Sequence, residues 1–171
     1  MKKDGIILLN KVKGISSFKA INQIKWNIGA SKIGHAGTLD PMAEGLMVVM
    51  VNSATKFSED LMKKDKEYYV EMELGYETDT YDAEGKKTKI YDGIIEYDEQ
   101  NVRDVINSFV GIQDQIPPMY SALKVNGRKM YEMAREGIEI ERKPRRVEIY
   151  SIRDITIKGK RITFYVEVSS G

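Results

Sequence analysis

The feature that most constrains the fold is a series of short apolar segments separated by glycine-containing turns. Residues 5–10 and 46–51 each predict a buried strand. Residues 147–157 and 161–168 are rich in β-branched side chains, and the turn at residues 158–160 between them predicts a hairpin. Because several strand pairs are joined by short turns, the sequence predicts a mixed α/β (α+β) domain with a largely antiparallel sheet.

Three segments carry the signals of helices that would flank this sheet. Ser16 or Ser17 can cap a helix that ends at Gly29, and Asp98 can cap a second helix, because short polar side chains accept from the free amides of a first turn. Ser53 is a candidate cap for a third helix that runs to about residue 64. After the first and second caps, apolar side chains recur at helical spacing, at Ala20, Ile21, Ile24 and Ile28 and at Val102, Val105, Ile106 and Phe109.

The middle of the chain predicts two further strands and a loop. Residues 68–74 alternate between apolar and polar side chains, as a half-buried strand does, and residues 90–97 predict another strand. Residues 75–87 between them predict a polar loop. With 171 residues the chain suits one domain.

Composition excludes several classes of site. The chain has no cysteine and one histidine, so disulfides, thiolate metal sites and multi-histidine metal centres are ruled out. It carries neither a phosphate-binding loop nor a dinucleotide fingerprint. No apolar run approaches the length of a membrane span, and we therefore expect a cytoplasmic protein that does not contact membranes.

Residues 79–85 form an acidic segment, Asp-Thr-Tyr-Asp-Ala-Glu-Gly, that superficially resembles a calcium-binding loop. When Gly85 is placed at the sharp turn of such a loop, Thr80 falls at the first ligand position and Tyr91 at the last. Both positions need carboxylates, so this interpretation fails.

The segment 34–45 contains three glycines and one proline, and it carries Asp40 between Leu39 and Pro41. A carboxylate fixed in such a loop can act as a nucleophile if it stays ionised, which needs a cationic partner or backbone donors. The alternative is that Asp40 caps or turns the loop before Pro41, and spacing alone favours this second interpretation. His35 has a similar pair of interpretations, a loop histidine bonded to a backbone carbonyl or an aromatic wedge that stacks on bases.

Residues 124–146 contain eight basic and four acidic side chains, a net charge of +4, whereas the whole chain carries only +1. This asymmetry predicts a local surface for phosphates, with Tyr120 and Tyr131 as nearby stacking groups. An ordinary solvated helix face explains the pattern equally well. The basic residues are Lys124, Arg128, Lys129, Arg135, Arg142, Lys143, Arg145 and Arg146.

Six segments in order along the chain resemble the motifs of the TruB-type tRNA pseudouridine synthases. The second of them contains Gly34-His35-Ala36-Gly37-Thr38-Leu39-Asp40-Pro41, which resembles the catalytic motif of that family. One such match would be weak, but six in the right order are highly specific. The segments are residues 5–17, 33–46, 54–57, 65–69, 75–85 and 115–137.

The resemblance implies a pseudouridine synthase fold and an enzyme that converts uridine 55 in the T-loop of tRNA to pseudouridine, without cofactor or metal. It implies that Asp40 is the nucleophile, attacking either C1′ of the ribose or C6 of the base. Tyr68 then stacks on the base and accepts the proton from C5, and Asp82 helps to hold the family's catalytic arginine. The target base must be flipped out of its stack, and His35 fills or props the space that it leaves. Lys11 supports the catalytic loop.

The resemblance also implies a domain organisation. Residues 1–171 correspond to the catalytic domain, and residues from about 112 to 146 correspond to a basic insertion that contacts the tRNA T-arm through Lys124, Arg128, Lys129, Arg142, Arg145 and Arg146. Val12 replaces the usual proline of the first motif. Val166 to Gly171 resembles the start of a third motif that continues Thr-Tyr-Ile-Arg in the family, so we expect a C-terminally truncated chain that lacks the arginine.

Three functions therefore remain in view. The first is a tRNA uridine-55 isomerase, which we expect to be a monomer and to be impaired in this truncated form. The second is a tRNA-binding or tRNA-folding module with little or no catalysis. The third is the related enzyme of guide-RNA-directed complexes, which the compact chain without a basic tail disfavours.

Overall fold

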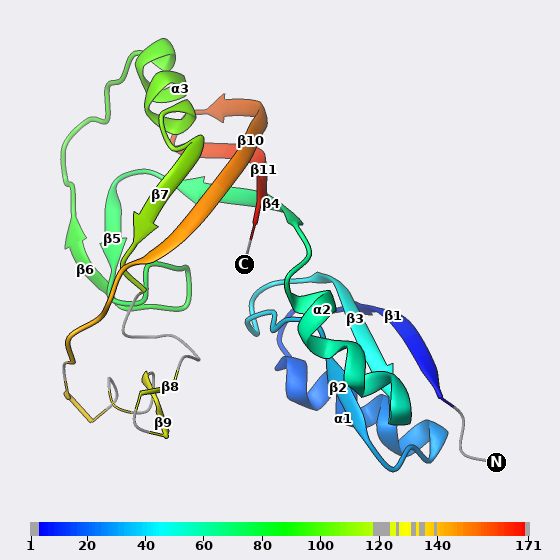
Figure 1. Ribbon diagram of the computed structural model, residues 1–171. Coiled ribbons are helices and arrows are strands. Elements are labelled where there is room, and N and C mark those ends of the chain that lie inside the picture. The colour runs from blue at the N-terminus through cyan, green and yellow to red at the C-terminus, as the bar shows by residue number, and fades with distance from the viewer. Residues whose placement is uncertain are drawn as a thin grey trace. The chain divides into compact units, whose positions relative to one another are not determined.

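The computed structural model describes residues 4–117, 124–125, 127–130, 133, 136–138 and 140–169 (Figure 1). They form two compact units. Unit 1 comprises residues 4–64, and unit 2 comprises the described residues from 65 to 169. The expectation that they act as one catalytic domain stays a prediction.

Unit 1 is a three-stranded antiparallel sheet with helices on both faces (Figure 1). The middle strand β3 pairs with β1 on one side and with the short β2 on the other. In chain order the elements are β1 (Gly5–Lys11), α1 (Ser17–Ile28), β2 (Ile33–His35), β3 (Gly45–Val51), the 3-10 helix η1 (Asn52–Phe57) and α2 (Ser58–Met62).

The predicted helix caps of α1 are confirmed. The Ser16 Oγ accepts a hydrogen bond from the Lys19 amide at 3.2 Å, and Gly29 ends the helix with a φ of 62°, a left-handed conformation that glycine adopts without strain. Ser16 is therefore the cap. Ser17 is instead buried, at 2% exposure.

Strand β1 is buried on one face only, so the prediction of a buried strand is half wrong. Ile7 and Leu9 pack against the core formed by Ile21, Met47 and Val49. The intervening side chain of Leu8 is 69% exposed. Alternation of this kind follows from the two-residue period of a strand, which places neighbouring side chains on opposite faces of the sheet.

The prediction that Ser53 caps a helix is wrong. Strand β3 runs directly into η1, whose first turn has no side-chain cap, and the Ser53 amide donates to Asp4 Oδ1 at 3.0 Å. Asn52 turns the chain here with a φ of 54°, and its Oδ1 accepts from the amides of Ser31 and Lys32. At this position the Asn52 side chain binds residues 31 and 32, and no side chain caps the first turn of η1.

Unit 2 is built on a four-stranded antiparallel sheet in the order β4-β11-β10-β7, with two separate two-stranded ladders (Figure 1). The small ladders pair β5 with β6 and β8 with β9. The elements are β4 (Lys66–Glu73), β5 (Tyr76–Thr78), β6 (Lys87–Ile90), α3 (Glu99–Asn107), β7 (Gly111–Gln115), β8 (Lys124–Val125), β9 (Arg128–Lys129), β10 (Arg145–Lys158) and β11 (Arg161–Val168).

The mixed α/β class with a largely antiparallel sheet is confirmed, as is the final hairpin, which is the pair β10–β11. Two details between residues 75 and 97 are wrong. The predicted polar loop contains β5, and the strand predicted at 90–97 ends at Ile90. In the observed ladder Glu77 faces Lys89, with Lys89 Nζ 3.0 Å from Glu77 Oε2, and Lys87 Nζ lies 3.8 Å from the centre of the Tyr76 ring, so cross-strand contacts accompany the earlier pairing.

Helix α3 begins as predicted, since Asp98 Oδ1 accepts from the Gln100 amide at 2.9 Å. Its buried face carries Ile106. Arg103 ties the helix to β10 by donating to the Ile155 carbonyl at 2.6 Å. This carbonyl follows Asp154, which has a φ of 57°, at a bulge in the β10–β11 ladder.

Candidate active site

In unit 1, a buried lysine holds the loop that carries Asp40. The side chain of Lys11 is 1% exposed, and its Nζ donates to the carbonyls of Val12 at 3.0 Å, Pro41 at 3.4 Å and Ala43 at 2.6 Å. An ammonium has three donors, so these three carbonyls satisfy it completely. The loop is therefore fixed to the end of β1 immediately after Asp40.

Ser17 holds the same loop on the other side of Asp40. Its Oγ donates to the Leu39 carbonyl at 2.6 Å and accepts from the Leu39 amide at 2.9 Å. The Asp40 carbonyl accepts from the Ala43 amide at 3.0 Å, which closes a turn with Pro41 at its second position. The structural interpretation of Asp40 as a turn residue therefore holds for its backbone, while its side chain remains exposed to solvent.

His35 lies at the end of β2 and is half-buried. Its Nδ1 is 2.6 Å from the Gly37 carbonyl. Since a carbonyl only accepts, Nδ1 carries the proton of this contact. This is the backbone-bonded histidine of the first interpretation, and the role of a base-stacking wedge stays a prediction.

In unit 2, Tyr68 lies on the edge strand β4 opposite Val166 and is half-buried. The next residue, Tyr69, points to the other face of the sheet and is 55% exposed, with its ring centre 5.1 Å from that of Tyr165. The alternation of the strand thus separates the two adjacent tyrosines, and only Tyr68 shares the face of Val166.

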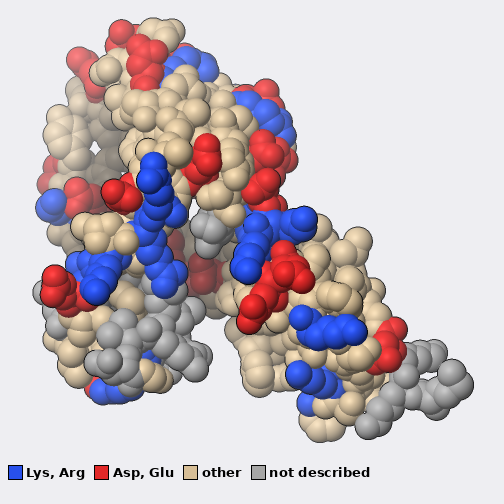
Figure 2. Space-filling model, viewed as in Figure 1, with Lys and Arg blue, Asp and Glu red and all other residues tan. Residues whose placement is uncertain are grey.

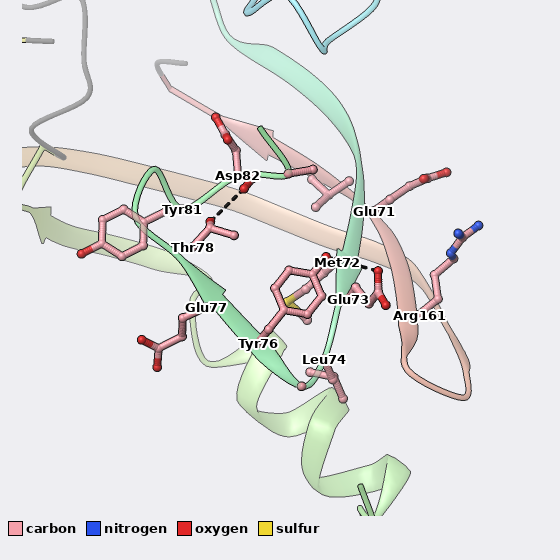
Figure 3. A pocket seen from close by; sticks show the side chains of 13 residues that line it. Glu71, Met72, Glu73, Leu74, Tyr76, Glu77, Thr78, Tyr81, Asp82 and Arg161 are labelled. Atoms are coloured by element: carbon pink, nitrogen blue, oxygen red, sulfur yellow. Dashed lines mark hydrogen bonds between the residues drawn. The ribbon is translucent and has the colours of Figure 1, made fainter. Parts of the chain in front are cut away.

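Asp82 organises the loop between β5 and β6. Its Oδ1 accepts from Thr80 Oγ1 at 2.7 Å and from the Glu84 amide at 2.9 Å. Its carbonyl accepts from Thr78 Oγ1 at 2.8 Å (Figure 3). These bonds orient the carboxylate locally, and its predicted contact with a catalytic arginine stays a prediction.

A cavity of about 630 Å³ lies beside this loop, between β4, β5 and the start of β11 (Figure 3). Asp82 and Tyr81 line it on the loop side, and Tyr76 lines it on the strand side. Partial burial raises the pKa of the Tyr76 phenol, and the Glu73 carboxylate raises it further. Tyr76 therefore stays protonated near neutral pH and donates to Glu73 Oε2 at 3.3 Å.

Several of the basic residues predicted to bind phosphates have internal partners. Arg128 Nη2 lies 2.6 Å from Glu136 Oε1, and Arg142 Nη1 donates to the Pro117 carbonyl at 3.3 Å. Figure 2 shows basic side chains grouped over the part of unit 2 where β10 begins. The backbones of Lys124 and Lys129 pair in the β8–β9 ladder, but their side chains lie outside the described residues, as do Tyr120, Tyr131 and Arg135.

The pair Arg145 and Arg146 opens β10, opposite Gln115 and Asp114 of β7, and both side chains are exposed. Consecutive residues of a strand point to opposite faces, so the two arginines cannot serve one flat phosphate-binding surface. One face of β10 presents Arg145 and the other presents Arg146.

Within the described residues, no three acidic or histidine side chains come together in a way that could hold a metal ion. None of the described helices is long and apolar enough to cross a membrane.

Comparison with known proteins identifies the family. The sequence profile described as TruB family pseudouridylate synthase (N terminal domain) matches residues 25–171. The chain belongs to this family. Among its TruB family relatives, a tRNA pseudouridine synthase B of Fusobacterium nucleatum subsp. nucleatum is 46% identical over 168 residues, which are 98% of this chain and 58% of the relative. A tRNA pseudouridine synthase B of Endomicrobium trichonymphae is 43% identical, over 98% of this chain and 73% of the relative.

The TruB family chain also resembles a solved structure, described as the crystal structure of a Cbf5-Nop10-Gar1 complex. The TM-score is 0.71 and the sequence identity is 28%, over 98% of this chain and 40% of that one. The resemblance inferred from the motifs is thereby confirmed, and so is the fold. The chain spans 58% of the length of the Fusobacterium relative.

Two residues of this TruB family chain escaped sequence reasoning. Ser17 anchors the loop of Asp40, although its position predicted a helix cap. A helix needs one cap, so the second of two adjacent serines was the available signal for another role. Tyr81, beside Asp82 in the cavity lining, gave no signal in the sequence.

Proposed function

We propose that this chain carries the catalytic residues of an enzyme that isomerises uridine 55 in the T-loop of tRNA to pseudouridine. The observation that carries the proposal is the double anchoring of the loop around Asp40. Lys11 and Ser17 are buried, and they form hydrogen bonds with the backbone on either side of Asp40. The Asp40 carboxylate itself is exposed to solvent. Such an arrangement suits a nucleophile that must be held still yet reach a substrate.

In the proposed reaction, the Asp40 carboxylate attacks the uridine at C1′ of the ribose or at C6 of the base. The glycosidic bond between N1 and C1′ breaks, the base rotates, and a bond forms between C5 and C1′. The bond between Asp40 and the substrate then breaks, which returns the carboxylate to its starting state. A proton leaves C5 and N1 gains one, so the reaction is an isomerisation that needs no redox partner. We assign the removal of the C5 proton to Tyr68, which also stacks on the base.

Access to the uridine requires the base to leave its stack, at a cost of about a few kcal/mol. We propose that His35 takes the space of the flipped base. Asp82, whose Oδ1 is already fixed by Thr80 and Glu84, then orients an arginine toward the nucleophile. The basic residues from about 112 to 146 bind the phosphates of the T-arm.

The test uses the full-length protein and T-arm RNA that carries tritium at C5 of the target uridine. Asp40→Asn removes the charge and keeps the size, so tritium release should fall by about 10⁴-fold or more. Glu44→Gln is the matched control, because Glu44 is an exposed carboxylate of the same loop and its loss should leave release unchanged. Tritium release that survives Asp40→Asn would sink the nucleophile assignment.

The alternative of a tRNA-binding module gives a different result in the same assay. A tRNA-binding module would bind T-arm RNA with an affinity that falls steeply as the salt concentration rises, and the wild-type protein would release no tritium. An isomerase would show the same salt dependence together with stoichiometric release.

A further inference from the structure

Tyr81 is held in an unfavourable backbone conformation at the tip of the β5–β6 loop. Its φ is 61°, and the other described non-glycine residues with positive φ are Asn52 and Asp154. Asparagine and aspartate tolerate this region because their short side chains bond locally, whereas a tyrosine has no such compensation.

Hydrogen bonds and close packing nevertheless hold the loop around Tyr81. Asp79 closes its base, since its amide donates to the Lys86 carbonyl at 3.1 Å and its Oδ1 accepts from the Lys86 amide at 2.8 Å. Gly85 packs so tightly inside the loop that a Cβ there would meet Thr80 Oγ1 at 2.2 Å. Strain that the surroundings hold in place this firmly tends to occur where a side chain has a functional task.

The Tyr81 side chain at this strained position is an exposed aromatic ring. Tyr81 is 80% exposed. Figure 3 shows its ring projecting outward from the loop, with Thr78 between it and Tyr76. Tyr76 differs, because Lys87 Nζ covers its ring and its hydroxyl bonds Glu73. Among the described residues, no side chain stacks on the Tyr81 ring or bonds its hydroxyl.

The cavity beside Tyr81 indicates which part of a nucleic acid would approach. Its lining includes Glu71, Glu73 and Glu77, with Arg161 as the single basic residue. Carboxylates repel phosphates, so a backbone would stay outside while an uncharged base can enter. A cavity of about 630 Å³ is large enough to hold a nucleobase.

We propose that Tyr81 is a stacking platform for an unpaired base of the RNA substrate. The inference rests on the proposed function, since Asp82 follows Tyr81 directly in the chain and is assigned to the site of isomerisation. Every base has a flat face that an aromatic ring can stack on, so the contact positions the RNA without reading its sequence. Tyr81 thus acts in substrate positioning and takes no part in bond making.

The first test compares three variants of Tyr81 in the full-length protein by T-arm RNA binding and by single-turnover tritium release. Tyr81→Ala keeps the Cβ and its strain, Tyr81→Gly removes both, and Tyr81→Phe keeps the ring. Stacking predicts binding about 5- to 100-fold weaker for Tyr81→Ala and Tyr81→Gly alike, and wild-type binding for Tyr81→Phe. The rate constant at saturating RNA should be unchanged in all three. Tyr91→Ala is the control, because Tyr91 is 60% exposed but does not line the cavity, and it should bind normally.

A purely structural role predicts a different order. If the ring made no contact with RNA, Tyr81→Gly would bind RNA as well as the wild type or better because it relieves the strain, and that result would overturn the proposal. Normal RNA binding by Tyr81→Ala, with tritium release intact, would overturn it as well.

The second test detects the stacked base directly. RNA with 2-aminopurine at one unpaired T-loop position at a time should show quenched fluorescence at one of these positions on binding, with the quenching retained in Tyr81→Phe and lost in Tyr81→Ala. Quenching that persists in Tyr81→Ala at every position would contradict the assignment. Failure of the proposed function looks different, because the wild-type protein would then release no tritium.

Discussion

The two loops that carry the candidate carboxylates are held by opposite means. The loop of Asp40 is fixed from outside, by Lys11 from β1 and by Ser17 from α1. The loop of Asp82 is fixed from within, by bonds among its own residues from Thr78 to Lys86. The first depends on packing with other elements, while the second would keep its shape wherever the ends of β5 and β6 are held.

This difference teaches where a mutation can act at a distance. Lys11 precedes Asp40 by 29 residues in the numbering, yet its ammonium donates to the carbonyls of Pro41 and Ala43, just after Asp40. Changes in β1 or α1 therefore reach Asp40 without touching it. Changes elsewhere in unit 2 should leave the Asp82 loop intact, and three comparisons of variants test this contrast.

The largest effect is expected from Lys11→Met, which fits the same space but leaves the carbonyls of Val12 and Ala43 without their donor, whereas the Pro41 carbonyl keeps the Gly14 amide. The free energy of unfolding should fall by about 3 kcal/mol, because buried acceptors of a charged donor are left unsatisfied. Tritium release should fall by roughly 100-fold or more as the loop shifts. Lys13→Met, at an exposed lysine two residues later, should change neither quantity. Urea denaturation and single-turnover kinetics measure both, and a fully active Lys11→Met would refute the external anchor.

A smaller effect is expected from Gly85→Ala in the other loop. The added Cβ would meet Thr80 Oγ1 and Asp79 Oδ1 at 2.2 and 2.6 Å, and both atoms are engaged in the bonds that hold the loop. Stability should fall by about 1–3 kcal/mol. Gly5→Ala is the matched control, since a Cβ there meets nothing within 4 Å, and its effect should stay within about 0.5 kcal/mol.

Amide hydrogen exchange shows whether the damage from Gly85→Ala is local. Faster exchange should be confined to residues 78–86 and should leave the amides of unit 1 unchanged. Faster exchange spread over β4 and β11 would mean that this loop, too, depends on its neighbours.

The finest distinction comes from two adjacent serines. Ser16→Ala removes a helix cap and should cost about 1 kcal/mol without slowing tritium release. Ser17→Ala breaks both bonds to Leu39 and should cost about 1–2 kcal/mol, with release slowed roughly 10-fold. Thermal unfolding and single-turnover rates separate the two, and equal rates for both variants would remove Ser17 from the anchor.

The parts of the fold that the sequence predicted are those whose signals are local. Helix α1 has its cap and its terminal glycine within one short segment, and the hairpin of β10 and β11 has its turn between the strands. The ladder of β5 and β6 was missed because its residue pairs, such as Glu77 with Lys89, lie on opposite sides of a loop. Strand β7 was missed because its partner, β10, lies far along the chain.

The candidate site divides in the same way. The family motifs pointed to Asp40, Tyr68 and Asp82 as a set, because ordered motifs carry more information than any one residue type. The motifs did not point to Tyr81, because the sequence around one tyrosine predicts neither a positive φ nor an exposed ring beside a cavity. The roles of all these residues stay predictions until the variants are measured.

The pairing of β4 with β11 has a consequence for synthesis on the ribosome. Glu73 pairs with Arg161 and Lys66 with Val168, so β4 emerges long before its partner exists, whereas β1 and β3 meet within unit 1. Until then the unpaired edge of β4 can form a ladder with a strand of another nascent chain. We expect its charged side chains, Lys66, Glu67, Glu71 and Glu73, to disfavour such pairing until β11 has been made.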